Sequence, residues 1–424
     1  MSRRLLLLLA VAGAVAVGNL YFPQAIAPLI ADGLGVSPDA ASLVVTATQI
    51  GYTAGMVLLV PLGDRFPHRS LLVVLLAVTG VALLAAGCAP ALPPLVAASA
   101  LIGLTTVAAQ VISPLAAGLV APDRRGAVLG ALLSGSTGGM LLARAFSGVL
   151  GEWLGWRAPY LVAAAVALVL AAVMAYAVPV TAPAAADARR PYREFLAEPL
   201  RLLRAEPELR RSCFYQAAVF GAFSAVWTSV ALLLAGPAYG YGAQAVGVLA
   251  LVGAVTMLCT PYAGRLVDRH GAGPVNLAAL AGVAVSAAVL AAGGSGGLPG
   301  LAALTAGTLL LDVAMQGGMI ANKARVYALR EDSLSRLTTA YMMCAYLGGT
   351  AGSWLGVRLY AAYGWGAVCV LVAALAAAGL LRHLWPRGGR RTGPGGRRHV
   401  RVRPARRGAG GRAAGRAGAP GGTG

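Results

Sequence analysis

Apolar residues recur along the chain in long blocks, separated by short stretches that carry charged side chains. A helix needs about 20 mostly apolar residues to cross the hydrocarbon core of a bilayer. Twelve blocks satisfy this requirement. The predicted spans cover residues 5–31, 42–62, 71–90, 93–120, 127–151, 157–180, 212–236, 243–264, 274–294, 298–324, 337–360 and 363–383. The pattern therefore predicts an all-α integral membrane protein with twelve transmembrane helices.

The composition excludes an ordinary soluble enzyme. Hydrophobic residues make up 58% of the 424 residues and charged residues 11%, whereas soluble domains carry about 25% charged residues. The sequence has no P-loop pattern, and its histidines and cysteines show no metal-binding spacing. We therefore expect no enzymatic activity, no cofactor and no bound metal, and we expect any transport to be driven by a solute or ion gradient.

Lysine and arginine gather on one side of the predicted bundle, and this asymmetry predicts its orientation. The basic side contains both termini and the segment 181–211, which has seven arginines from Arg189 to Arg211. The opposite side has only Arg157 and Arg358. We therefore expect a multi-pass protein of the inner (plasma) membrane, with both termini in the cytoplasm.

The segment 181–211 divides the predicted spans into six plus six, and the two sets share sequence features. Asp64-Arg65 follows the second span, and Asp268-Arg269 follows the eighth. A Gly-Trp pair precedes both the sixth and the twelfth span. Such repeats are typical of secondary transporters. The predicted organisation is a six-helix half at 1–180, a cytoplasmic loop at 181–211, a second six-helix half at 212–383 and a tail at 384–424, with a surface helix expected within Tyr192–Leu209.

The tail is rich in arginine and glycine. From Arg387 onwards it contains eleven arginines and no acid, so it is predicted to be disordered. It either attaches to anionic lipids or is a solvated extension that reinforces the orientation. The tail lacks aromatic side chains that would stack on bases, so no nucleic-acid partner is expected.

The loop after the second span carries the first of two related motifs. The sequence from Leu62 to Arg69 resembles the signature loop of the major facilitator superfamily, and Gly264 to Gly271 resembles its second copy. The resemblance implies the major facilitator fold, in two six-helix repeats. It also implies that this loop is a cytoplasmic gate that governs the exchange between inward-open and outward-open states. By position, the gate residues are Asp64, Arg65, Arg69, Gly264, Asp268, Arg269 and Gly271. The first copy departs from the pattern at Val60 and Pro67, where glycine is usual.

Three further stretches narrow the resemblance within the superfamily. Asn19–Gln24, Gly139–Arg144 and Leu311-Asp312 look like the group that contains sugar and nucleoside exporters and drug/proton antiporters. That group implies the exchange of a small-molecule substrate for protons. We expect the protein to be a monomer in the lipid bilayer. The fifth span lacks the Gly-Pro pair usual in the antiporter pattern.

Two ionisable residues lie well inside predicted spans. Asp312 is the only one of the 14 acids placed near the middle of a span, and Arg144 lies in the outer part of span five. Charges in this setting normally face a cavity or a partner. Asp312 is the proton-coupling candidate, or else a structural carboxylate. Arg144 holds an anionic substrate group, pairs with an acid, or extends towards the outer surface as an anchor.

The resemblance also places spans one, four, seven and ten around a central cavity. Besides Arg144, the substrate-cavity candidates that follow are Asn19, Tyr21, Gln24, Gln110, Gln216, Trp227, Thr228 and Gln316. Their amide, hydroxyl and aromatic groups suit a sugar, a nucleoside or an amphipathic drug. Pro23 and Pro28 in span one and Pro114 in span four are expected to kink these helices.

These observations predict a secondary active transporter that exports a small organic solute by alternating access, in exchange for protons. One alternative is a proton-coupled or facilitative importer. Another is a transporter-like membrane sensor that binds a ligand without moving it.

Overall fold

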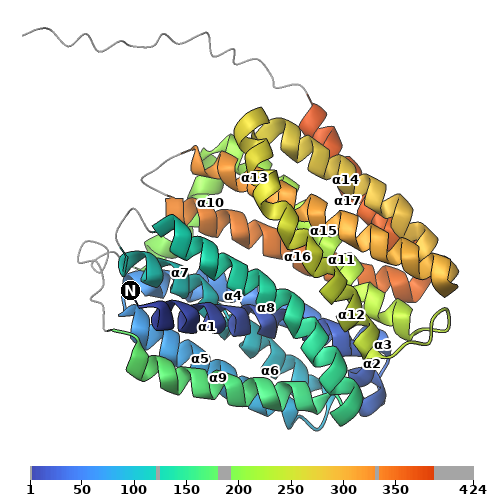
Figure 1. Cartoon of the computed structure of the whole chain (residues 1–424), viewed down its shortest axis with the longest axis horizontal. Coiled ribbons are helices and arrows are strands. Elements are labelled where there is room, and N and C mark those ends of the chain that lie inside the picture. Colours follow the sequence, from blue (N-terminus) through green and yellow to red (C-terminus); the bar gives the residue numbers. More distant parts are fainter. Residues whose placement is uncertain (1, 121–124, 180–191, 330–333, 386–424) are drawn as a thin grey trace, which may run out of the picture. The chain divides into compact units, whose positions relative to one another are not determined.

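The computed structural model describes residues 2–120, 125–179, 192–329 and 334–385, and its regular elements in these ranges are all helices (Figure 1). Residues Met1–Leu384 form one compact unit. The helices of the first six spans are α1 (Arg3–Tyr21), α2 (Pro23–Leu34), α3 (Pro38–Ala41), α4 (Leu43–Leu58), η1 (Val60–Asp64), α5 (His68–Gly87), α6 (Leu92–Thr105), α7 (Ala108–Gly118), α8 (Arg125–Leu154) and α9 (Arg157–Ala177). They are followed by α10 (Tyr192–Ala205), α11 (Pro207–Ala235), α12 (Ala243–Gly253), η3 (Ala254–Leu258), α13 (Cys259–His270), α14 (Ala272–Ala292), η4 (Gly293–Ser295), α15 (Gly297–Tyr327), α16 (Leu334–Tyr363) and α17 (Trp365–Leu384).

The twelve predicted spans correspond to twelve successive helices or helix pairs. Within the described residues, nine of them are long and apolar enough to cross a membrane by length and composition alone. The other three are formed by α8, by α12 with α13, and by α16. The fold is therefore the predicted twelve-helix membrane bundle.

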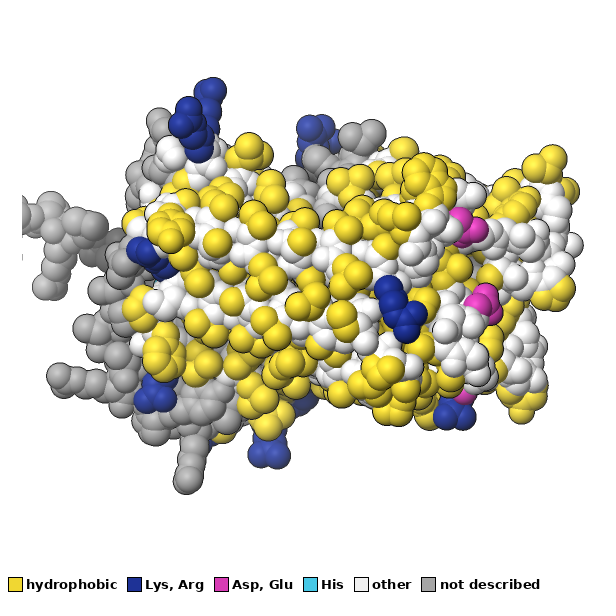
Figure 2. Space-filling view, turned by 90° about the horizontal axis from the view of Figure 1, so that it is seen from below, with side chains coloured by type: hydrophobic (Ala, Val, Ile, Leu, Met, Phe, Trp, Pro, Cys, Tyr) yellow, Lys and Arg dark blue, Asp and Glu magenta, His cyan; other side chains and the backbone are white. Residues whose placement is uncertain are grey.

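The surface agrees with this assignment. Hydrophobic side chains cover most of the face shown in Figure 2, and the charged side chains visible there lie mostly towards its ends. Tyr176, Leu298 and Val370 are examples of large apolar residues that are 90%, 78% and 69% exposed. Exposed apolar area of this extent fits a lipid environment and not water.

We call the end of the bundle where α1 begins and α17 ends the terminal end, and the opposite end, where α2 ends and α12 begins, the far end. At the terminal end, Arg211 donates a hydrogen bond from a terminal guanidinium nitrogen to the carbonyl of His383 at 2.9 Å, joining the start of α11 to the end of α17. At the far end, Arg157 donates to the carbonyl of Ala89 at 3.1 Å.

Span one is interrupted at Pro23, one of the two prolines that were expected to kink it. Helix α1 ends at Tyr21 and α2 begins at Pro23, whose missing N–H suits the first position of a helix. The carbonyl of Phe22 at the break accepts a hydrogen bond from Ser147 Oγ of α8 at 2.9 Å. Pro28, in contrast, lies inside α2. The kink expected in span one thus lies at Phe22-Pro23, where the regular helix is interrupted although Phe22 keeps right-handed helical dihedral angles.

Span four is also interrupted, but not at Pro114, where a kink was expected. Helix α6 ends at Thr105 and α7 begins at Ala108, whereas Pro114 lies inside α7. The Thr105 hydroxyl donates to the carbonyl of Leu101 at 2.9 Å and bonds the Thr79 hydroxyl of α5 at 2.7 Å. Such side-chain bonds to the preceding turn accompany bends in helices.

The two sets of six spans repeat their local geometry. Gly155 and Gly364 both have positive φ, 83° and 76°, in the turns before α9 and α17. A side chain at Gly139 of α8 would collide with the backbone of α1 at Ala14, and one at Gly348 of α16 would collide with the backbone of α11 at Ala217. The same close helix pairing therefore occurs between spans one and five and between spans seven and eleven.

The segment between the two sets differs slightly from its predicted form. The surface helix α10 ends at Ala205, and α11 already begins at Pro207, before the predicted limit of 212. Arg336 of α16 pairs with Glu198 of α10 at 2.5 Å, which ties α10 to the bundle. The predicted tail from residue 386 onwards lies outside the described residues.

Candidate functional site

A cavity of about 380 Å³ lies between the two sets of six spans. Its described lining comes from α1, α4, α7 and α8 of the first set and from α11, α15 and α16 of the second. It extends from Tyr21, at the end of α1, to Lys323 and Tyr327, in the last turns of α15. The cavity therefore runs from the middle of the bundle towards the terminal end.

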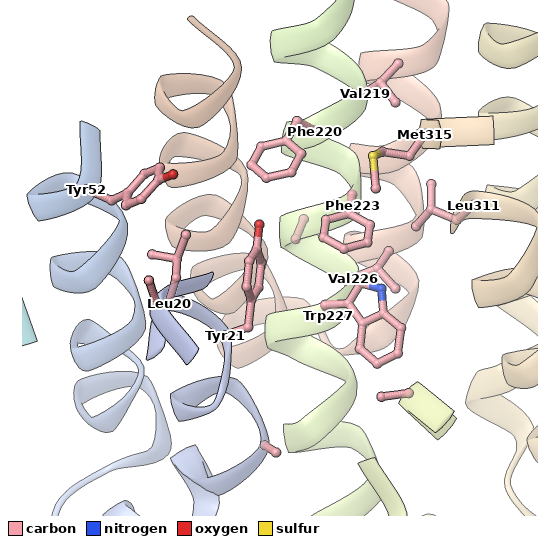
Figure 3. Packing of buried hydrophobic residues seen from close by; sticks show 14 of the residues in the cluster. Leu20, Tyr21, Tyr52, Val219, Phe220, Phe223, Val226, Trp227, Leu311 and Met315 are labelled. Carbon is pink, nitrogen blue, oxygen red and sulfur yellow. The ribbon is translucent and has the colours of Figure 1, made fainter. Parts of the chain in front are cut away.

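Aromatic side chains from both sets close the inner end of this cavity. Tyr52 of α4 and Tyr346 of α16 have ring centroids 4.5 Å apart, and Phe220 of α11 meets Tyr346 edge-on at 5.1 Å. Gln110 Nε2 donates to the Tyr52 hydroxyl at 3.0 Å. Figure 3 shows Tyr21 facing the side of α11 that carries Phe220, Phe223 and Trp227. This aromatic layer separates the cavity from a buried polar cluster.

Arg144 is the basic member of that cluster and is fully buried. Its Nε donates to Gln24 Oε1 at 3.0 Å, but its two terminal nitrogens have no hydrogen-bond partner in the described structure. The guanidinium carbon lies 4.2 Å from the centroid of the Trp227 ring and 5.1 Å from that of Tyr21. Arg144 therefore does not extend to the outer surface. It is stabilised by aromatic faces and retains unused donors.

Asp312 of α15 is the acidic member and is 4% exposed. Trp227 Nε1 of α11 donates to Asp312 Oδ1 at 3.1 Å, so one indole contacts the acid through its N–H and the base through its face. The carboxylate and the Arg144 guanidinium also attract one another electrostatically. A hydrogen bond to a charged group contributes about 1.5–3 kcal/mol. A change in the charge of Asp312 would thus alter its hydrogen bond to Trp227 in the second set of spans and its attraction to Arg144 in the first set.

The two sets meet closely at the far end. A Cβ at Gly148 of α8 would lie 2.6 Å from the Ala243 carbonyl oxygen of α12, and a Cβ at Gly247 would lie 2.7 Å from Ala145 Cα. Glu152 Oε2 accepts a hydrogen bond from the Ala243 backbone nitrogen at 2.8 Å. Glu152 therefore caps α12 from the opposite set of spans. The cavity is closed on this side.

The structure assembles most of the predicted cavity residues in two adjoining places. Tyr21, Gln110, Gln216 and Gln316 line the cavity. Gln24, Arg144, Trp227 and Asp312 form the buried cluster behind the aromatic layer.

Two of the predicted cavity residues lie elsewhere. Asn19 lines a separate apolar crevice of about 280 Å³ between α1, α8 and α9. The Thr228 hydroxyl is engaged with Ser353 Oγ of α16 at 2.9 Å and does not line the central cavity.

The predicted gate residues of the first copy lie at the terminal end. Asp64 ends η1, and its side chain is outside the described part of the structure. Arg65 follows in a turn, and its backbone nitrogen donates to the Leu62 carbonyl at 3.0 Å. Arg69 donates to the carbonyl of Ala175, in the last turn of α9. Because the last carbonyls of a helix lack partners within it, Arg69 fixes the end of α9.

The second copy adopts a different local structure. Gly264, Asp268 and Arg269 lie on α13, which continues to His270, so they are helical and not part of a loop. Asp268 and Arg269 are exposed. Gly271 follows with a φ of 81°, a conformation that favours glycine, and starts the turn into α14.

Sequence reasoning missed two residues of this region. Lys323 carried no predicted role in the cavity, but it lies on the cavity wall in α15. Glu152 carried no predicted role, although it joins the two sets of spans at the far end. The short spacing from Gly148 to Glu152, one helical turn on the same face, is the signal that could have indicated a packed contact.

A model of the Major Facilitator Superfamily matches residues 8–323. The uncharacterized transporter YgaY of Escherichia coli O157:H7 is 34% identical over 389 residues, which cover 92% of this chain and 96% of that protein. A chloramphenicol resistance protein of Streptomyces lividans is 32% identical over 290 residues, or 62% of this chain and 73% of that protein. The solved structure of the nucleoside transporter NupG has a TM-score of 0.73 at 12% identity, covering 89% of this chain and 98% of that one.

Proposed function

Because this chain belongs to the Major Facilitator Superfamily and is a multi-pass membrane transporter, we propose that it exports a small organic solute in exchange for protons. The observation that carries the proposal is the cavity between the two sets of spans, which extends to one end of the bundle and is closed at the other. Such a cavity is half of an alternating-access cycle. The chloramphenicol resistance relative supports the outward direction and a drug-like substrate.

The orientation follows from the basic side chains. The terminal end carries the arginine-rich segments, so we assign it to the cytoplasm, with both termini there and the protein in the inner membrane. The structure then corresponds to an inward-open state. Residues 1–180 and 212–383 are proposed to rock against one another as two bodies, within a monomer, with 181–211 as their connection.

Asp312 is the proposed proton carrier of this cycle. When Asp312 is ionised, its carboxylate holds the Trp227 N–H and attracts Arg144 of the other set of spans. When it is protonated, this attraction is lost and the contact between the two sets near the far end weakens. Arg144 cannot take this role itself, because a guanidinium stays protonated in proteins. Proton binding is thereby linked to opening of the far end.

Solute binding is assigned to the cavity below the aromatic layer. Gln110, Gln216 and Gln316 offer amide donors and acceptors there, and Tyr21 offers an aromatic face. Gln216 Oε1 already accepts from the Tyr341 hydroxyl at 2.8 Å, which orients its amide so that the NH₂ group remains to bind a solute acceptor.

The test is substrate-induced proton movement in proteoliposomes that contain a pH-sensitive dye. Wild type, Asp312→Asn and the control Asp32→Asn, which removes an exposed acid at the end of α2, are compared across sugars, nucleosides, chloramphenicol and aromatic carboxylates. The proposal expects proton flux with one class of solute in wild type and the control, but not in Asp312→Asn.

Three other outcomes would separate the alternatives. Solute flux without proton flux in wild type would contradict coupling and indicate a facilitator. Proton flux in the same direction as the solute would indicate an importer. Binding without any flux would indicate a sensor.

A further inference from the structure

The charge on the wall of the central cavity is positive. Of the described residues that line it, Lys323 is the one basic side chain, and no carboxylate is among them. Lys323 is also the single lysine of the chain. The nearest acid on its own helix is Asp312, eleven residues away, which corresponds to about 16 Å along the helix axis.

The acid of the cluster does not neutralise this cavity. Asp312 is held by Trp227 behind the aromatic layer, and its attraction is directed to Arg144. Arg144 and Asp312 carry opposite charges and both contact Trp227, so their fields oppose one another, and the field that remains in the cavity is mainly that of Lys323. A cation in a partly buried wall lacks part of its hydration, and a solute of opposite charge offsets this loss.

Further donors lie behind the deep end of the cavity, on the other side of the aromatic layer. The terminal nitrogens of Arg144 have no partner in the described structure and lie just behind the Tyr21 ring. Near the cavity mouth, Met319 and Tyr327 flank Lys323 at one helical turn on either side and provide apolar contact area.

We propose that this cavity selects organic anions, with Lys323 as the residue that determines the charge preference. This inference rests on the proposed transport function and specifies its substrate class. The anionic group of the solute, a carboxylate, sulfonate or phosphate, pairs with the Lys323 ammonium, and its apolar body packs against the methionine and aromatic side chains. Lipophilic cations are repelled at the same point.

The experiment measures the electrostatic preference of the cavity directly. Ser113, which lines the cavity from α7, is changed to cysteine in a full-length protein whose five native cysteines are replaced. The thiol is reacted with the anionic 2-sulfonatoethyl and the cationic 2-(trimethylammonium)ethyl methanethiosulfonate. In each reaction the thiolate attacks the sulfenyl sulfur, a mixed disulfide forms, and methanesulfinate leaves. The reference is a protein that retains only Cys88, an exposed thiol at the far end.

The expected result is a ratio of anionic to cationic rates that is about tenfold higher at Ser113→Cys than at Cys88, from one unit charge nearby at intermediate effective dielectric constant. Lys323→Gln should abolish the excess, and Lys323→Arg should retain it. Retention in the arginine variant shows that loss in the glutamine variant reflects charge and not misfolding. A ratio equal to that of Cys88, no reaction at Ser113→Cys, or a ratio unchanged by Lys323→Gln would overturn the proposal.

A flux comparison separates this inference from the function on which it rests. 4-Hydroxybenzoate, 4-hydroxybenzamide and 4-hydroxybenzylamine share one ring and differ in charge. Proton-coupled flux of the amine at the rate of the benzoate or above it would support the proposed transport function but overturn the anion preference. An anion-preferring cavity without any coupled flux would do the reverse.

Discussion

The two ends of the interface between the sets of six spans are packed differently. At the far end, backbones of α8 and α12 approach at Gly148 and Gly247, and Glu152 caps α12 across the interface. Towards the terminal end, tyrosine, methionine and glutamine side chains surround a cavity. The difference shows that the far end closes through small residues whose contact permits no added atoms, whereas the other side leaves volume for a solute.

The largest expected effect comes from adding a side chain where the backbones meet. Gly148→Leu would place atoms against the Ala243 carbonyl, which lies 2.6 Å from a Cβ at this position. Overpacking costs roughly 1–3 kcal/mol. We expect a cost near the upper end of this range, which would shift the equilibrium towards the far-open form by about 150-fold. Spin labels replacing Trp153 and Tyr241, both exposed at the far end, should move apart. The control is Gly130→Ala on the same helix, where an added Cβ would have no neighbouring atom within 4 Å.

The second effect concerns the buried cluster that joins the two sets. Trp227→Leu removes the ring that lies 4.2 Å from the Arg144 guanidinium carbon. A desolvated cation–π contact contributes about 2 kcal/mol, so the far end should open about 30-fold more often. Trp227→Phe keeps an aromatic face but loses the N–H donated to Asp312. Its population of the far-open form should therefore lie between those of wild type and Trp227→Leu. Equal label distances in Trp227→Leu and wild type would show that the cluster does not hold the far end closed.

A smaller effect is expected from the helix cap. Glu152→Ala leaves the Ala243 backbone nitrogen without its acceptor. Loss of a cap typically costs about 1 kcal/mol, which corresponds to about fivefold in the population of the far-open form. Glu152→Gln retains an oxygen acceptor and should raise the population of the far-open form by less. The same pair of spin labels measures both, and an alanine variant indistinguishable from wild type would remove Glu152 from the closing contacts.

The smallest effect is expected from the ion pair between Arg358 and Asp39. The two groups lie 3.8 Å apart at the far end, and the arginine side chain is 60% exposed. Exposed pairs of this kind contribute about 0–1 kcal/mol. Arg358→Ala should therefore change the population of the far-open form by less than about fivefold, and high salt should remove even that change. A larger shift would mean that the far end depends on surface charge as much as on packing.

Much of the fold could be predicted from hydrophobic pattern alone, because each span must satisfy its own backbone within the bilayer. All twelve spans were placed within a few residues, and the break at Pro23 follows from the missing N–H of proline. The break at Thr105 could not be predicted, since it accompanies a side-chain bond to Thr79 of another helix.

The site was only partly predictable, because it too depends on contacts between helices that are distant in the sequence. The sequence identifies Asp312 and Arg144 by their cost in a membrane, but the indole that joins them lies 85 residues from Asp312. Lys323 shows the limit most clearly, since the rotation of α15 about its own axis decides whether this lysine faces the cavity or the surface. That rotation is set by packing between helices, and no local pattern encodes it.

The central claim is that the two ends open alternately and that the charge of Asp312 controls the exchange. The most direct measurement uses two label pairs in proteoliposomes, Trp153 with Tyr241 at the far end and Phe66 with Tyr262 at the terminal end, all at exposed positions. Distances are recorded at neutral pH, at acidic pH and in Asp312→Asn. The account predicts that acid and the asparagine variant both lengthen the far-end distance and shorten the terminal-end distance. Distances that stay fixed, or that change in the same direction at both ends, would contradict it.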